Sequence, residues 1–367
     1  MNKHLSCPSC KRAYEYELDI CTWCHVPLFV TETTDERVVA VTRVDVPSIG
    51  HEEVPYWCAL AENDAGRLSL HKLSQETSVG EPLHDDAAQE RTGTVGIIGT
   101  GTMGVGLTGL MASLDWDVVF VSRTMESAQQ ARDVVLERLS RTMDERELAA
   151  AGDHILPTDD PAALADCDVV IESVAEDLTV KRETLQRIEP HLRPDALLVT
   201  NTSGLSLDEL ASVLQHPVRF GALHFFNPVN RMRLVETSAA SATSSETAEE
   251  LDRLAIALGK TPVRVKARPA FVVNRVLMPL INEAVRSLEE EAADAEHIDE
   301  AIRLGLNHPM GPLALADLIG LDVVVEIMEN LVEQTGDDGY RPRPSLTRLV
   351  AAGQLGRKAG SGFYTYE

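Results

Sequence analysis

Two residues, His224 and Glu236, are spaced so that they could act together on a proton. His224 ends an apolar strand predicted over residues 218–224, and Glu236 follows twelve residues later, where the chain can return on the next strand. A histidine exchanges a proton near neutral pH, so it can serve as base and acid when a secondary alcohol is oxidised or its ketone reduced. The carboxylate would orient the imidazole and favour its charged form. Taken alone, His224 could instead be a structural histidine in the core, with its ring nitrogens hydrogen-bonded to neighbouring groups.

A glycine-rich turn follows the apolar residues 95–98 and opens an apolar helix that runs to residue 114. Its glycines are Gly99, Gly101 and Gly104, with Thr102 and Met103 between them, and another strand is predicted over residues 117–121. Strand, G-x-G-x-x-G and helix in this order are typical of dinucleotide binding, in which the helix N-terminus meets the pyrophosphate. We therefore expect all five residues to contact a dinucleotide.

The second strand of this unit ends in Ser122 and Arg123, where an acidic residue would normally bind the adenosine ribose. A serine and an arginine can instead bind a 2′-phosphate, the arginine through charge-assisted contacts. This predicts a preference for NADP(H) and, with it, a reductive role. In the alternative, Arg123 stacks on the adenine while Glu126 reaches back to the ribose, and NAD serves as the cofactor.

Four of the six cysteines lie within the first 24 residues, as two C-x-x-C pairs separated by ten residues: Cys7, Cys10, Cys21 and Cys24. Four thiolates at this spacing are typical of a zinc ribbon. In such a site the four ligands complete the tetrahedral coordination of the zinc, which stabilises the fold and catalyses no reaction. Disulfides or free thiols are the alternative. Cys58 and Cys167 are predicted to be buried apolar side chains.

The remaining pattern predicts an α/β fold with additional domains at both ends. Strands alternate with helical segments across the central region, which indicates a Rossmann-type parallel sheet with helices on both faces. Apolar residues then recur at helical spacing from residue 277 onward. We predict a zinc ribbon, a small OB-like β-domain, a linker, a dinucleotide-binding domain and an all-helical C-terminal domain, over residues 1–30, 31–75, 76–92, 93–268 and 269–367.

Composition excludes several classes of function. The chain has 33 basic and 58 acidic residues and a formal net charge of −25, which would repel a nucleic acid backbone. Its apolar runs are far shorter than a membrane span requires, and its N-terminus lacks the features of a secretory signal. We therefore expect a cytoplasmic protein that binds neither nucleic acid nor membrane.

Several motifs together resemble the 3-hydroxyacyl-CoA dehydrogenase family, of the 3-hydroxybutyryl type. They are G-A-L-H-F-F-N-P-V at 221–229, N-T-S-G-L at 201–205, L-V-E at 234–236, F-V-V-N-R at 271–275, H-P-M-G-P at 308–312 and G-R-K-A-G-S-G-F-Y at 356–364. The resemblance covers residues 93–367. The ribbon and β-domain resemble, over about 70 residues, proteins associated with acyl-CoA thiolases.

The resemblance implies interconversion of 3-hydroxyacyl-CoA and 3-ketoacyl-CoA with NAD(P). It assigns the acid–base pair to His224 and Glu236, a hydrogen bond to the substrate oxygen to Ser203, and the substrate carbonyl to Asn274. Positions near the cofactor match Glu176, Lys181, Asn227 and Lys358. A homodimer through the C-terminal domain is also implied, with a thiolase as a further partner of the N-terminal module.

The chain departs from the family at Ala270, where glycine is usual, and in the helical hairpin after the second strand, which lacks the usual serine and lysine contacts to coenzyme A. Arg132, Arg138 and Arg141 could take the phosphates instead, although an exposed helix face is the simpler interpretation. The same chemistry on a substrate bound to an acyl carrier protein is therefore an alternative. A non-catalytic protein that docks a thiolase is a second one.

Overall fold

The computed structural model describes residues 93–366 and, before them, residue 79 and six strands. Those strands are β1 (Lys3–Ser6), β2 (Ala13–Tyr14), β3 (Phe29–Glu32), β4 (Arg37–Val44), β5 (Tyr56–Glu62) and β6 (Leu68–Leu73). β4, β5 and β6 pair antiparallel in chain order, whereas in a second sheet β1 pairs antiparallel with both β2 and β3. β4, β5 and β6 lie within residues 31–75, for which a small β-domain was predicted. The four cysteines of the predicted zinc ribbon lie outside the described residues.

The chain divides into two compact units, Met1–Arg91 and Thr92–Glu367. The second contains an eight-stranded sheet of order β14-β13-β12-β11-β10-β7-β8-β9. Its strands are β7 (Thr94–Ile98), β8 (Asp117–Val121), β9 (Ile155–Thr158), β10 (Val169–Glu172), β11 (Leu197–Thr200), β12 (Phe220–Phe225), β13 (Leu234–Ala239) and β14 (Thr261–Arg264).

One strand pair corrects the prediction of a parallel sheet. Each neighbouring pair is parallel except β12 and β13, which are antiparallel. Only residues 226–233 connect these two strands. A connection this short closes a hairpin, whereas a parallel return needs a crossover of a dozen or more residues. The sheet is therefore mixed and mostly parallel.

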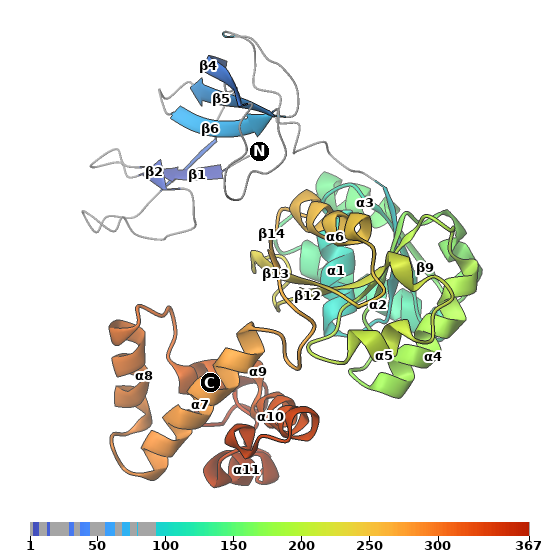
Figure 1. The fold of residues 1–367 in the computed structure, drawn as a ribbon. Coiled ribbons are helices and arrows are strands. Elements are labelled where there is room, and N and C mark those ends of the chain that lie inside the picture. The colour runs from blue at the N-terminus through green and yellow to red at the C-terminus, as the bar shows by residue number, and fades with distance from the viewer. Residues whose placement is uncertain are drawn as a thin grey trace. The chain divides into compact units, whose positions relative to one another are not determined.

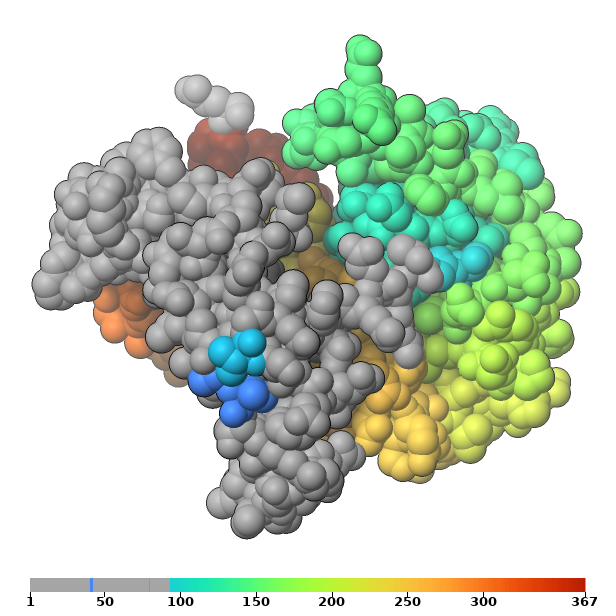
Figure 2. All heavy atoms as spheres, turned by 90° about the horizontal axis from the view of Figure 1, so that it is seen from above, coloured from blue at the N-terminus to red at the C-terminus, as the bar shows by residue number. Residues whose placement is uncertain are grey.

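Helices cover both faces of this sheet (Figure 1). The helices α1 (Thr102–Ala112), α2 (Met125–Leu139), α3 (Glu145–Asp153) and α6 (Ser245–Ala257) pack on one face, and α4 (Leu178–Ile188) and α5 (Leu207–Ala211) on the other. Successive strand residues enter opposite cores: Phe120 packs on the α1 side and Val119 on the α4 side. In the space-filling view, segments coloured cyan through yellow-green form one continuous surface (Figure 2).

The C-terminal part is helical, as predicted, and has a core of its own. It consists of α7 (Val273–Glu289), α8 (Ala295–Gly305), α9 (Pro312–Ile319), α10 (Leu321–Thr335) and α11 (Pro344–Ala351). Buried Asp317 accepts hydrogen bonds from the amides of Phe363 and Tyr364 and from the hydroxyl of Tyr366, so it holds the end of the chain against α9. No helix in the described ranges is long and apolar enough to cross a membrane.

Candidate active site

His224 and Glu236 lie directly opposite each other on the hairpin of β12 and β13. The imidazole Nδ1 is 2.8 Å from Glu236 Oε2, and both side chains are buried. An ionised carboxylate can only accept, so Nδ1 carries the proton in this contact. His224 also lines the cavity of about 980 Å³ described below. Its remaining ring nitrogen, Nε2, is therefore the atom that can exchange a proton with a ligand.

The second oxygen of Glu236 binds the start of α7. Oε1 accepts hydrogen bonds of 3.0 Å from the backbone amides of both Val272 and Val273. A carboxylate at a helix N-terminus satisfies unpaired amides and interacts favourably with the helix dipole. Burial alone would raise the pKa of Glu236, but the bonds from His224 and from these amides outweigh it, so the pKa is lowered. The carboxylate is therefore ionised at neutral pH.

The chain enters α7 through an unusual backbone turn. Ala270 and Phe271 both have positive φ angles, 60° and 48°, which are uncommon for residues with a side chain. Ala270 occupies the position where the family usually has glycine, and the left-handed conformation explains that preference. The turn places Phe271 against the imidazole, with ring centroids 5.5 Å apart. It also places half-buried Asn274 in the first turn of α7.

A cavity of about 980 Å³ lies at the carboxyl ends of β7, β8, β10 and β12. Its lining includes Gly99, Gly101, Thr102 and Met103 of the glycine-rich turn. Gly99 has φ of 107°, which L side chains rarely adopt. A Cβ at Gly104 would lie 1.9 Å from the carbonyl oxygen of Gly99, so this glycine lets α1 approach β7. The cavity and the uncapped N-terminus of α1 fit a dinucleotide. Nucleotide-binding folds bind their ligands at the same place, the carboxyl edge of the sheet.

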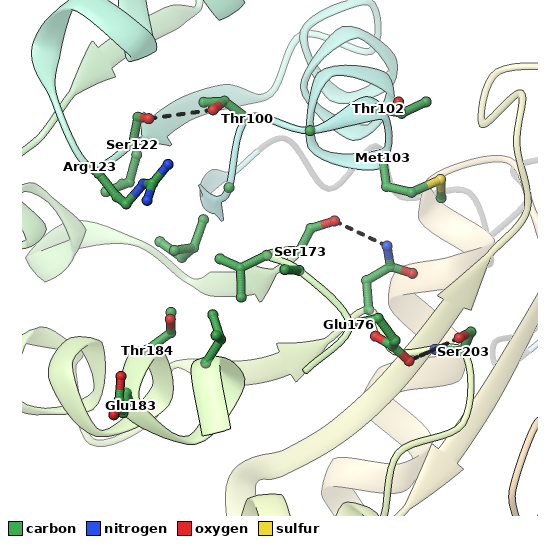
Figure 3. Close-up of a pocket in the computed structure, with 18 of the residues that line it drawn as sticks. Thr100, Thr102, Met103, Ser122, Arg123, Ser173, Glu176, Glu183, Thr184 and Ser203 are labelled. Carbon is green, nitrogen blue, oxygen red and sulfur yellow. Dashed lines mark hydrogen bonds between the residues drawn. The ribbon is translucent and has the colours of Figure 1, made fainter. Parts of the chain in front are cut away.

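Ser122 and Arg123 lie at one end of this cavity and Glu176 and Ser203 at the other (Figure 3). The hydroxyls of Ser122 and Thr100 are 3.4 Å apart. Glu126, which sequence analysis considered for the ribose, does not line the cavity and instead accepts a hydrogen bond from Gln130. Two charged residues of α4 do line it, Glu183 and Arg187.

Glu176 and Ser203 are joined at the second end. Glu176 Oε1 accepts from the Ser203 hydroxyl at 2.9 Å, from the Ser203 amide at 2.7 Å and from the Thr202 hydroxyl at 2.6 Å. These contacts connect the loop after β10 to the loop after β11. Because the Ser203 hydroxyl donates its hydrogen bond to Glu176, the Ser203 oxygen has free lone pairs that can accept a hydrogen bond from a ligand.

A fully buried ion pair lies next to the loop that carries Glu176. Lys181 Nζ lies 2.8 Å from Glu172 Oε1 and 3.5 Å from Glu176 Oε2, and the side chains of Lys181 and Glu172 are both 0% exposed. Glu172 also accepts from the amide of Val174 and the hydroxyl of Thr200. Lys181 was expected near the cofactor, but it does not line the cavity. It positions Glu176 instead of facing a ligand.

Four further predicted residues do not line the large cavity: Gly104, Asn227, Asn274 and Lys358. Asn227 is exposed on the β12–β13 connection. Lys358 pairs with Asp322 at the start of α10, 2.6 Å away.

Cys167 is buried, as predicted. Its burial, and to a lesser extent the negative charges of Asp168 and Asp166, raise its pKa to about 12. Among the described residues, no cluster of three or more His, Cys, Asp or Glu side chains could hold a metal ion.

Four residues at or beside the site were not predicted from the sequence: Glu172, Asn201, Thr202 and Arg187. Asn201 joins three strand ends: its amide group donates to the Ser173 hydroxyl, and its carbonyl oxygen accepts from the Phe225 amide. A polar residue at the end of an apolar strand was the available signal for Glu172 and Asn201. Arg187 has no such signal, because only the tertiary structure brings the exposed side of α4 beside β8.

Known proteins are similar to this chain over the part that contains the mixed sheet and the C-terminal helices. Residues 94–268 match the family described as 3-hydroxyacyl-CoA dehydrogenase, NAD binding domain, and residues 271–366 match the C-terminal domain of that family. A probable 3-hydroxybutyryl-CoA dehydrogenase of Deinococcus radiodurans is 41% identical over 275 residues, which are 74% of this chain and 99% of that protein. The 3-hydroxybutyryl-CoA dehydrogenase of Clostridioides difficile is also 41% identical, over 74% of this chain and 98% of its own.

A solved structure agrees with these matches. The crystal structure of (S)-3-hydroxybutyryl-CoA dehydrogenase from Ralstonia eutropha has a TM-score of 0.71 and 40% identity. It covers 75% of this chain and 99% of that chain. The similarity therefore excludes about the first quarter of this chain, where the cysteine pairs lie.

Replacing Lys181 with Met should lower the free energy of unfolding by about 3–5 kcal/mol, because the Glu172 carboxylate would remain buried without its partner. Urea denaturation at pH 7 measures this loss. Gln186→Met, on the exposed side of the same helix, is the control and should change stability little. A loss below about 1 kcal/mol for Lys181→Met would contradict a stabilising role for the ion pair.

Ionisation of Glu236 should make the free energy of unfolding depend on pH in the acidic range. Its pKa lies below the ordinary value of 4.5, so its stabilisation is fully present above about pH 4.5 and is lost as the pH falls through the lowered value. Glu236→Gln cannot ionise, so its unfolding free energy should change less with pH in this range. The exposed Glu290→Gln is the control. Identical pH dependence in wild type and Glu236→Gln would show that the carboxylate contributes nothing.

Proposed function

Because the chain belongs to the 3-hydroxyacyl-CoA dehydrogenase family, we propose that it interconverts 3-hydroxybutyryl-CoA and acetoacetyl-CoA by hydride transfer with a nicotinamide dinucleotide. The observation that carries this proposal is the buried His224–Glu236 pair at the wall of the dinucleotide cavity, with Ser203 lining the same cavity. A bound nicotinamide would supply the hydride acceptor or donor. The glycine-rich turn and the residues at the end of β8 would hold that dinucleotide.

The acid–base chemistry follows from the geometry of the pair. In oxidation, His224 Nε2 takes the proton of the substrate hydroxyl, and in reduction the imidazolium returns it. Glu236 holds Nδ1–H in place and stabilises the positive charge that forms on the ring. Ser203 hydrogen-bonds the substrate oxygen, and Asn274 positions the thioester carbonyl. Lys181 keeps Glu176, and through it Ser203, in place.

A short acyl chain is favoured by a small cavity next to Ser203. It holds about 20 Å³ and is lined by the apolar Leu205, Ala270, Ile327 and Leu331, with the polar Glu176, Asn330 and Gln334 beside them. One water needs about 10–15 Å³ by this kind of measure, so the cavity accepts one or two small groups. This space suits the terminal methyl group of a four-carbon substrate and disfavours longer chains.

The dinucleotide is proposed to be NADP(H). No carboxylate stands directly after β8, where the chain has Ser122 and Arg123, and Arg187 lines the same cavity from α4. Two guanidinium groups and a hydroxyl form a donor set that suits a 2′-phosphate. Glu183 lies on the same helix and opposes this preference, but two positive charges outnumber it.

Four further proposals come from the sequence. The protein is proposed to be cytoplasmic, to bind one structural zinc through Cys7, Cys10, Cys21 and Cys24, and to dock a thiolase through its N-terminal module. The C-terminal helices are proposed to form a homodimer. Val276, Leu304 and Leu306 support the last proposal, because their apolar side chains are exposed in the helical part and a subunit interface would cover them.

His224→Ala should lower kcat for acetoacetyl-CoA reduction by about 100-fold or more, because the proton donor is lost. Dinucleotide binding, measured by fluorescence titration, should stay near the wild-type value. His216→Ala, an exposed histidine outside the site, is the matched control. Near-normal turnover of His224→Ala would refute the proposed acid–base role.

Cofactor preference is tested by kcat/KM with NADPH and NADH. The wild type should favour NADPH, and Arg123→Ala and Arg187→Ala should each lower kcat/KM for NADPH by about tenfold or more, since each removes a charge-assisted contact. Ser122→Asp should shift the preference toward NADH by like-charge repulsion. A higher kcat/KM with NADH in the wild type would overturn the NADP(H) proposal and leave the dehydrogenase proposal intact.

A further inference from the structure

One stretch of the chain, from residue 253 to residue 282, carries positive charge only. It has no Asp or Glu in thirty residues, whereas the whole chain has 58 acidic residues among 367, about one in six. Six side chains in it are cationic: Arg253, Lys260, Arg264, Lys266, Arg268 and Arg275. In a chain with a formal net charge of −25, such a stretch creates a local field opposite to that of the whole protein.

The fold gathers four of these cations around one pocket of about 430 Å³. It lies between β14 and α7 and is lined by Arg264, Lys266, Arg268 and Arg275 with Val265, Phe271 and Val272. Arg264 pairs with Asp252, and the Arg275 guanidinium lies 5.9 Å from the centre of the Tyr340 ring. Lys266 and Arg268 are exposed and have no ion-pair partner among the described residues. The pocket therefore presents uncompensated positive charge.

This basic pocket, defined by Arg264, Lys266, Arg268 and Arg275, shares two lining residues with the catalytic pair. Phe271 packs on the His224 ring, and the Val272 amide donates to Glu236. Asn274 lies between Val272 and Arg275 in the chain, in the first turn of α7. A ligand in the pocket would therefore bind next to residues that hold the proposed site together.

The arginines in α2 and just after it are less suited to bind phosphate. Arg132 donates to the carbonyl oxygens of Ile155 and Gly152, so it holds β9 and α3 against α2. Arg141 pairs with Glu137 at 2.9 Å on an exposed surface. In contrast, no carboxylate competes for Lys266 and Arg268 in the described part of the chain.

We propose that the basic pocket binds the phosphate groups of the coenzyme A thioester substrate. The inference rests on the proposed function, because the coenzyme A thioester of that function carries a diphosphate and a ribose phosphate at the far end of its pantetheine arm. Lysine and arginine bind phosphate oxygens through charge-assisted hydrogen bonds. The pocket also offsets locally the repulsion that a polyanionic substrate meets from the acidic protein.

The test compares thioesters that differ only in phosphate content: acetoacetyl-CoA, acetoacetyl-dephospho-CoA and acetoacetyl-pantetheine. Lys266→Ala/Arg268→Ala should raise KM for acetoacetyl-CoA by about 10- to 100-fold, with kcat unchanged, because two charge-assisted contacts are lost. KM for acetoacetyl-pantetheine and for the dinucleotide should not change. Lys266→Arg/Arg268→Lys keeps both charges and should stay close to wild type. Thermal unfolding of each variant checks that the fold is intact.

Two more measurements complete the design. Arg138→Ala/Arg141→Ala removes the same charge from the end of α2 and the turn that follows it, and it should leave KM for acetoacetyl-CoA unchanged. Added salt should raise KM for acetoacetyl-CoA more in the wild type than in Lys266→Ala/Arg268→Ala, because salt screens the contacts that the variant lacks. Calorimetric titration with coenzyme A should show the matching loss of affinity without any turnover.

Several results would overturn the inference. These are an equal rise in KM for acetoacetyl-pantetheine, a rise for the dinucleotide alone, a rise in Arg138→Ala/Arg141→Ala, or unchanged affinity for coenzyme A in Lys266→Ala/Arg268→Ala. Failure of the proposed function looks different: the wild type would turn over none of the three thioesters, while the calorimetric titration would still decide whether the pocket binds coenzyme A.

Discussion

The Glu236 carboxylate joins two parts of the protein that have separate hydrophobic cores. One oxygen binds the His224 ring at the edge of the sheet, and the other binds the first amides of α7 in the helical part. A buried carboxylate is costly unless each oxygen is paired, so this residue constrains both neighbours at once. The position of Asn274 in the first turn of α7 relative to His224 depends on that single group. Proton chemistry and the placement of the helical part are therefore coupled.

Buried charge also organises the opposite wall of the cavity. The Lys181–Glu172 pair lies beneath the loops that carry Glu176 and Ser203, and Asn201 ties three strand ends together. Such a pair adds little net stability compared with an apolar substitute, but removing one partner is severely destabilising. Its effect is to hold the loops in one arrangement. The cavity thus has one wall set by backbone glycines and another set by buried ionic contacts.

Charge is distributed unevenly over this acidic chain. Most of the surface repels anions, yet the proposed substrate and dinucleotide are both polyanions. Positive side chains are concentrated at Arg123 and Arg187 in the large cavity and around Lys266 and Arg268 in the basic pocket. A uniformly basic surface would attract anions of every kind. Local cationic sites on an acidic background select ligands by where their phosphates lie.

Much of the architecture could be predicted from the sequence, because apolar periodicity and glycine spacing are local properties. The glycine-rich turn, the alternation of β7 to β12 with helices and the helical C-terminal part were all predicted. Periodicity reports which residues are buried, but it does not report which strands are neighbours. The antiparallel hairpin that sets His224 opposite Glu236, the burial of Lys181 on Glu172 and the approach of Arg187 to the cavity were decided by tertiary packing. The basic pocket belongs to the same class, since its cations converge only once β14 and α7 are placed.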